Sequence, residues 1–163
     1  MFEKFHALEP HKQNRILNAA MNEFNLRGYK NASTNKIVKE ASIGKGMLFH
    51  YFHSKKDLYL YLYDYSVKTL MNEFYGKIDL SERDILKRLR QVIVMEFTLI
   101  GRYPDMLDFV KSAYFEESEE VKDELDIRSR NYIASGSSKV LQDVDVSRFK
   151  ENVDKDRAVH VIM

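Results

Sequence analysis

The side chains best suited to chemistry lie close together in the first third of the chain. His50 and His53 are three residues apart, a spacing that lets two imidazoles share a metal ion, but no Asp, Glu or Cys completes a plausible ligand set nearby. The sequence contains no cysteine, which excludes disulfides and thiolate zinc sites. No glycine-rich phosphate loop, nucleophile elbow or paired-carboxylate constellation is present. We therefore expect no metal, no cofactor and no enzymatic activity.

Charge is distributed unevenly along a chain whose net charge is only +1. Residues 1–56 hold ten Lys and Arg against four Asp and Glu, whereas residues 57–163 hold sixteen against twenty-one. A basic segment beside an acidic remainder indicates that the N-terminal part meets an anion such as nucleic acid. A solvated surface without a partner is the alternative.

Apolar residues at helical spacing predict an all-α protein, and few glycines or prolines interrupt them. A first helix is expected over 12–26, with Gly28 ending it, and its apolar stripe contains Leu17, Ala20, Met21 and Phe24. Short helices are expected over 34–40, capped by the Ser33 hydroxyl, and over 45–52. No apolar run reaches the length of a membrane span, so we expect a cytoplasmic protein.

A longer helix is predicted from Lys55 to Tyr75, with Ser54 as its cap and Asp57 completing a capping box. Leu and Tyr alternate from Leu58 to Tyr63 as in a strand, but no turn residue interrupts the segment, which favours a helix apolar on most sides. The tyrosines in this segment indicate core packing or, alternatively, an aromatic pocket.

Further helices are expected over 82–100, opened by Ser81 with Asp84, and over 106–114, with Gly101 and Pro104 between them. The acidic cluster at 116–120 is interpreted as a solvated corner. Helical spacing continues over 121–132, and the sequence leaves open whether a helix runs through Gly136.

The two short helices and the brief turn between them, over 33–52, have the organisation of a helix-turn-helix. At about 100° per residue, Leu48 and Phe52 share one face and His50 points away from them. Leu48 and Phe52 are therefore expected in the core, whereas Gly46, Met47 and His50 face outward. Lys45, in the first turn, can reach a base or a phosphate.

The run from Ala41 to Phe52, followed by Ser54-Lys55-Lys56-Asp57-Leu58, resembles the DNA reader of the TetR family. The resemblance covers roughly residues 9–69, and it departs from the family pattern at Ser42, Gly44 and Met47, where Gly, Ser and Thr are usual. It implies phosphate contacts by Tyr51 and Lys55. The DNA-contacting residues that it implies together with the helix geometry are Thr34, Asn35, Lys45, Gly46, Met47, Phe49, His50, Tyr51 and Lys55.

The resemblance implies an N-terminal DNA-binding domain, or reader, over 9–69 and a helical ligand-sensing and dimerisation region over 70–163. The implied function is a bacterial repressor, a homodimer that a small-molecule effector releases from double-stranded operator DNA. Glu96 stands alone in an apolar stretch and could serve a pocket or lie on the surface. Candidate pocket residues, which could equally form a closed core, are Phe97, Ile100, Met106, Phe109 and Tyr114.

The residues also allow a second function and indicate a shortened chain. The alternative function is a helical ligand-binding or partner-binding module whose basic N-terminus is a docking surface. The apolar run from Ala158 to Met163 stops before completing two helical turns, so we expect a C-terminally truncated chain that dimerises weakly or differently.

Overall fold

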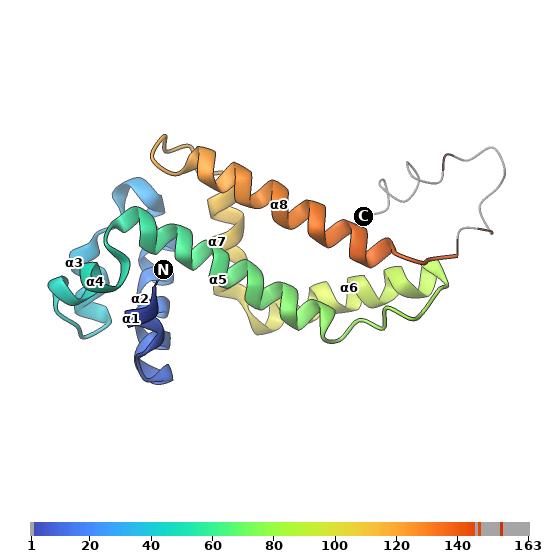
Figure 1. Cartoon of the computed structure of the whole chain (residues 1–163), viewed down its shortest axis with the longest axis horizontal. Helices are drawn as coiled ribbons and strands as arrows, with labels where there is room; N and C mark the ends of the chain where they lie inside the picture. The colour runs from blue at the N-terminus through green and yellow to red at the C-terminus, as the bar shows by residue number, and fades with distance from the viewer. Residues whose placement is uncertain (1, 146, 148–153, 155–163) are drawn as a thin grey trace.

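The computed structural model describes residues 2–145, 147 and 154, and Figure 1 shows the arrangement of its helices. The regular secondary structure of the described part consists of helices, with no strand, which confirms the all-α prediction. The apolar run at 158–163 lies outside the described residues. The helices are α1 (Glu3–His6), α2 (Pro10–Asn31), α3 (Thr34–Glu40), α4 (Lys45–Phe52), α5 (Lys55–Tyr75), α6 (Ile85–Arg102), α7 (Pro104–Tyr114) and α8 (Lys122–Leu141).

Helices α1 to α4 gather at one end of the molecule and form the unit that we call the reader (Figure 1). Gly28 interrupts α2 with a left-handed backbone (φ 67°), after which the helix resumes as far as Asn31. The predicted stop at Gly28 is therefore a kink, which glycine permits because it has no β-carbon. Ser33 precedes α3 but its hydroxyl makes no capping bond; instead its N–H donates to Glu23 Oε1 at 2.9 Å.

The short helix α1 packs behind α4. Phe5 is completely buried, with its ring centroid 4.7 Å from that of Phe52. The Gln13 side chain holds the following turn by donating from Nε2 to the carbonyl oxygens of His6 (3.1 Å) and Leu8 (2.7 Å). Residues 2–8, which the expected boundary at residue 9 leaves out, thus contribute to the core of the reader.

Helix α5 connects the reader to the remaining helices and has the predicted bounds. Its cap is as expected, because the Asp57 N–H donates to Ser54 Oγ (2.9 Å) and the Ser54 hydroxyl donates to Asp57 Oδ2 (2.7 Å). Its side chains are buried around most of the circumference in the half next to the reader, notably Leu58, Tyr59, Leu60, Leu62 and Tyr63. The alternation of Leu and Tyr therefore reflects a helix packed on several sides.

Helices α6, α7 and α8 pack against α5, and we call this part the sensor region (Figure 1). Asp84 caps α6 by accepting from the N–H groups of Leu86 and Lys87, so α6 begins later than predicted. Gly101 does not end α6, which runs to Arg102, and α8 continues through Gly136. Among the described residues, none of the helices combines the length and apolarity of a membrane span.

Candidate nucleic-acid interface and adjoining cavity

The second helix of the helix-turn-helix, α4, separates its buried and exposed residues as the spacing predicts. Leu48 and Phe52 are 1% and 0% exposed, which fixes the helix against the core. Lys45, Gly46, Met47 and His50 are exposed on the outer face, and Phe49 is half-buried beside them. A helix held this way presents a row of donors and an apolar side chain of the type that reads base edges in a major groove.

The turn before α4 explains one departure from the family pattern. Ser42 adopts a left-handed backbone with φ of 50°, a conformation that residues with a β-carbon rarely take. Glycine suits this position better because it has no β-carbon, which is the physical reason that it is usual there.

Helix α3 adds polar groups that flank this surface. Thr34 is half-buried and Asn35 is exposed at its first turn, where backbone N–H groups are available to a phosphate. Lys36 and Lys39 are exposed on the same helix, and the site predicted from the sequence did not include them. The excess of Lys and Arg over residues 1–56 was the signal that could have found them.

Tyr51 does not border the surface as the resemblance implied. It is 4% exposed, its ring lies 6.2 Å from that of Phe5, and its hydroxyl has no hydrogen-bond partner among the described residues. The reason lies in helix geometry, because Tyr51 is three residues after Leu48 and therefore shares the core face of α4. A phosphate contact through this hydroxyl would require the side chain to leave the core.

Lys55, the implied phosphate clamp, is engaged within the protein. Its Nζ donates to the carbonyl oxygens of Tyr29 (2.9 Å), Lys30 (3.2 Å) and Ala32 (3.5 Å). The same ammonium lies 4.6 Å from the centroid of the Tyr29 ring. Because the last carbonyls of a helix lack intrahelical partners, Lys55 acts here as a cap on the end of α2.

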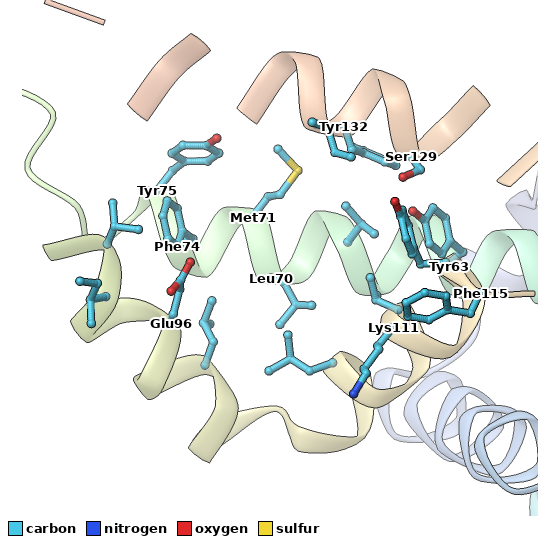
Figure 2. Close-up of a pocket in the computed structure, with 18 of the residues that line it drawn as sticks. Tyr63, Leu70, Met71, Phe74, Tyr75, Glu96, Lys111, Phe115, Ser129 and Tyr132 are labelled. Atoms are coloured by element: carbon cyan, nitrogen blue, oxygen red, sulfur yellow. The ribbon is translucent and has the colours of Figure 1, made fainter. Parts of the chain in front are cut away.

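A cavity of about 700 Å³ lies in the sensor region between α5, α6, α7 and α8 (Figure 2). Most of its wall is apolar, and Glu96 and Lys111 supply the charged groups. Glu96 lines the cavity and is also exposed to solvent, so both positions that the sequence allowed apply to it. The lining residues named in Figure 2 are Tyr63, Leu70, Met71, Phe74, Tyr75, Glu96, Lys111, Phe115, Ser129 and Tyr132.

Of the expected pocket residues, Tyr114 lines this cavity and the others do not. Phe97 and Ile100 lie on another face of α6, 72% and 56% exposed. Phe109 is buried in the reader core, and Met106 packs between the two larger hydrophobic clusters. Helical spacing showed which residues share a face of α6 but could not show which face meets the cavity.

A polar network borders the cavity where α5 meets α8. Asp64 accepts hydrogen bonds from the Tyr132 hydroxyl (3.1 Å) and from Arg128 Nε (3.3 Å). Burial, with the nearby Asp64 carboxylate, raises the pKa of Tyr132 to about 12, so the phenol remains neutral at physiological pH. Burial also raises the pKa of Tyr63. The cavity therefore offers neutral phenol groups at one side of an apolar interior.

The fold and site define a class: a helix-turn-helix protein whose reader is joined to a helical region with a ligand-sized cavity. Residues 16–62 match the family model for bacterial regulatory proteins of the tetR family. Over 95 residues the chain is 28% identical to the uncharacterised HTH-type transcriptional regulator YdgC of Bacillus subtilis, covering 56% of this chain and 49% of that protein. The chain thus spans about half the length of this relative.

Solved structures support the same fold over most of the chain. A TetR family transcriptional regulator from Chloroflexus aurantiacus superposes with a TM-score of 0.69 at 23% identity, covering 98% of this chain and 74% of that one. The regulator FadR from Bacillus subtilis in complex with stearoyl-CoA gives 0.71 at 19% identity, covering 91% and 80%. The family model therefore matches the helix-turn-helix and the segments on either side of it, and the solved structures share the fold of most of the chain.

Proposed function

We propose that the protein is a sequence-specific DNA-binding transcription regulator, a repressor that a small apolar effector releases from its operator. The observation that carries this proposal is α4, whose core residues Leu48 and Phe52 hold an exposed face of Lys45, Gly46, Met47 and His50. A rigid helix with such a face fits a major groove. The cavity in the sensor region supplies a place for the effector.

Within this proposal the exposed residues have different tasks. His50 and Met47 meet base edges, with Met47 offering an apolar contact where the family usually has a hydroxyl. Lys45, Lys36 and Lys39 neutralise phosphates, which gives affinity without sequence information. Lys55 acts mainly through the fold, because its ammonium already holds the end of α2.

The shape and chemistry of the cavity favour an elongated apolar effector. Its volume of about 700 Å³ lies within the range of ligand pockets. The lining runs along α5 from Tyr63 to Tyr75, a rise of roughly 18 Å at 1.5 Å per residue. The FadR structure from Bacillus subtilis contains stearoyl-CoA, a molecule with a long acyl chain. We propose an effector of this class, with its polar end at the open side of the cavity.

A homodimer is the proposed assembly on DNA. Two readers must lie about 34 to 36 Å apart to enter successive major grooves on one side of the duplex. Sedimentation of the protein at micromolar concentration, alone and with duplex, tests this state. A monomer that binds a single half-site would refute the proposed dimer.

The test of DNA binding begins with selection of a preferred sequence from a random duplex pool. On the selected duplex, Lys45→Ala should weaken binding and lower the log–log salt slope by about one unit. Lys68→Ala is the matched control, because Lys68 is exposed on α5 outside the reader. If no sequence is enriched and both variants behave alike, the alternative of a partner-binding module with a basic docking surface is favoured.

The test of the effector uses stearoyl-CoA as a probe. Binding should raise the melting temperature and, over the same concentration range, weaken binding to the selected duplex. Met71→Trp, which places an indole ring in the cavity, should weaken both effects, whereas Phe97→Trp on the exposed face of α6 should change neither. Stabilisation without any change in DNA affinity would show that the cavity is not regulatory.

A further inference from the structure

The segment between α7 and α8 makes a direct polar contact with the reader. Glu116 Oε2 accepts the backbone N–H of Tyr29 at 3.0 Å, and Glu120 Oε2 accepts the Tyr29 hydroxyl at 2.5 Å. We interpreted the acidic cluster at 116–120 as a solvated corner; Glu120 is indeed exposed and Glu116 is half-buried, but both bind Tyr29, which that interpretation did not include. Two carboxylates of the sensor region meet one tyrosine of the reader.

The kink in α2 makes this contact possible. At Gly28 the backbone is left-handed, so the helical path breaks and the N–H of Tyr29 can donate to an acceptor outside the helix. Tyr29 is 2% exposed, and its N–H and hydroxyl both need partners in place of water. Burial, with the hydrogen bond to Glu120, raises the pKa of Tyr29 above its usual range, so the hydroxyl remains a donor.

Tyr29 is held on its other side by the beginning of α5. Its carbonyl oxygen accepts from Lys55 Nζ at 2.9 Å, and its ring lies 5.1 Å from that of Tyr59. Lys55 follows α4 by only two residues, His53 and Ser54. One buried tyrosine thus joins the sensor region to the junction between α4 and α5.

The acidic segment also continues the wall of the cavity. Tyr114 and Phe115 line the cavity, and Glu116 is the next residue (Figure 2 shows Phe115 at one side of the site). Both aromatic side chains are largely exposed, so a ligand could bury them further. A displacement of this end of α7 would be transmitted to Glu116 through one peptide unit.

We propose that Glu116, Glu120 and Tyr29 form a latch that fixes the reader relative to the sensor region and transmits occupancy of the cavity to α4. The carboxylates are positioning residues, because they act on DNA binding through Tyr29 and Lys55. The regulatory consequence rests on the proposed function, whereas the fixing of the reader does not. The two parts therefore need separate measurements.

The first measurement tests the latch without DNA or ligand. The chain has no cysteine, so spin labels can be placed through Asn14→Cys in α2 and Asp126→Cys in α8, both exposed. Double electron–electron resonance should give one narrow distance distribution for the otherwise unmodified protein. Tyr29→Phe combined with Glu116→Leu, which removes both hydrogen bonds of the latch, should broaden or shift it. An unchanged distribution would overturn the proposal.

The control for this measurement lies in the same segment. Glu117 pairs with Lys122 of α8 at 2.7 Å, on the sensor side, so Glu117→Gln should leave the distribution unchanged. Glu120→Gln retains an acceptor for the tyrosine hydroxyl and should broaden it less than Glu120→Leu. Equal broadening by Glu117→Gln would show general loosening of the segment and would also overturn the proposal.

The second measurement tests transmission, with stearoyl-CoA as the probe of occupancy. In the unmodified protein, occupancy should weaken binding to the selected duplex about 5- to 150-fold, the usual range of allosteric coupling. Tyr29→Phe with Glu116→Leu should bring this ratio close to one. A ratio equal to that of the unmodified protein would refute transmission through the latch.

The outcomes separate the two proposals. If stearoyl-CoA does not change DNA binding in the unmodified protein, the ligand-responsive function fails, and the distance measurement alone decides the latch. If occupancy changes DNA binding but the latch variants respond as the unmodified protein does, the function stands and the latch is refuted.

Discussion

The reader and the sensor region are both helical but differ in how completely their side chains are packed. In the reader, the large side chains between α2, α4 and α5 are almost entirely withdrawn from solvent, including Phe24, Leu48, Phe52 and Leu58. In the sensor region, the cluster around Leu70 and Leu99 is less deeply buried, and a cavity of about 700 Å³ lies beside it. One chain thus combines a closed core with an open one.

This difference corresponds to the two proposed tasks. A surface that reads DNA needs fixed side-chain geometry, and dense packing of Leu48 and Phe52 gives α4 that geometry. A sensor needs a cavity for its ligand. The side chains that line an empty cavity lack the van der Waals contacts that would stabilise a filled core. The apolar residues exposed on α6, such as Phe97, show the same incomplete packing.

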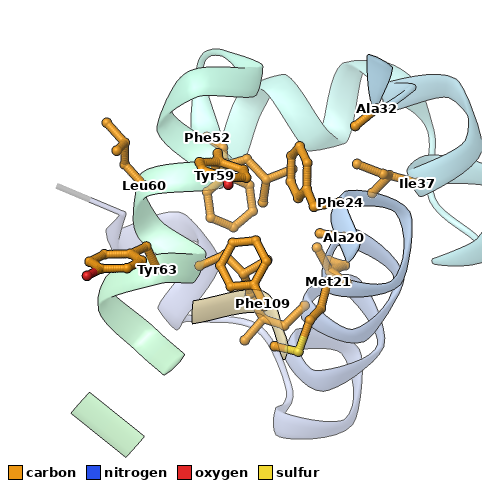
Figure 3. Close-up of a cluster of buried hydrophobic side chains, with 14 of the residues drawn as sticks. Ala20, Met21, Phe24, Ala32, Ile37, Phe52, Tyr59, Leu60, Tyr63 and Phe109 are labelled. Carbon is orange, nitrogen blue, oxygen red and sulfur yellow. The ribbon is translucent and has the colours of Figure 1, made fainter. Parts of the chain in front are cut away.

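Helix α7 belongs to both regions. The Phe109 ring packs against Phe24 and Tyr59 of the reader core, with centroid distances of 6.2 and 5.2 Å (Figure 3). Leu107 and Val110, on either side in the sequence, line the cavity. The closed core and the open cavity are therefore separated by the width of a single helix.

The contrast in packing predicts unequal costs for the same substitution. Phe52→Ala should lower the free energy of unfolding by about 3 to 5 kcal/mol, because it leaves a void in a closed core. Phe74→Ala, at the half-buried wall of the cavity, should cost about 1 kcal/mol, since it enlarges a space that already exists. Urea unfolding measures both values. Equal losses would contradict the distinction between closed and open regions.

The extent of the closed core can be tested at its N-terminal edge. Phe5→Ala should cost about 3 kcal/mol, at the low end for a buried phenylalanine because a short terminal helix can detach. It should also weaken DNA binding by removing the support behind Phe52. His6→Ala, at an exposed neighbour, is the control and should change stability by less than about 0.5 kcal/mol. A negligible effect of Phe5→Ala would place the boundary of the reader at residue 9.

Substitution of Lys55, at the boundary between the two regions, should have a smaller effect on stability. Lys55→Ala should lower the free energy of unfolding by about 1 kcal/mol, because carbonyl groups at the end of α2 lose their donor. It should change the salt slope of DNA binding by less than Lys45→Ala does. A full unit of slope lost with unchanged stability would instead identify Lys55 as a phosphate contact.

The ionisation of one tyrosine in each region provides the smallest expected effect, which is negligible near neutral pH. Burial raises the pKa of Tyr61, behind α4, and of Tyr132, at the cavity, to about 12 in each case. The folded protein then binds these protons more tightly than the unfolded chain, so stability is retained below pH 10 and falls as pH rises towards 12. Tyr61→Phe and Tyr132→Phe should each remove part of the late phenolate signal in an absorbance titration.

The titration also sharpens the comparison of regions. Stearoyl-CoA bound in the cavity should delay ionisation of Tyr132 and leave Tyr61 unaffected. If both phenols ionised near pH 10, neither tyrosine would have the raised pKa that burial in its region is expected to cause.

Local features of this protein could be predicted from its sequence. The bounds of α4 and α5, the cap formed by Ser54 and Asp57, and the burial of Leu48 and Phe52 all follow from capping chemistry and helical spacing. The family resemblance rests on the same short stretch, since residues 16–62 match the family model. These features depend on residues a few positions apart, which the sequence shows directly.

Other features depended on contacts between distant segments. The partners of Lys55 lie 23 to 26 residues away, and Glu116 and Glu120 reach Tyr29 across 87 and 91 residues. The side of α6 that faces the cavity was likewise decided by how α5 and α7 pack, because α6 carries apolar residues on more than one face. Periodicity fixes which side chains share a face, but only the packing of helices determines what that face meets.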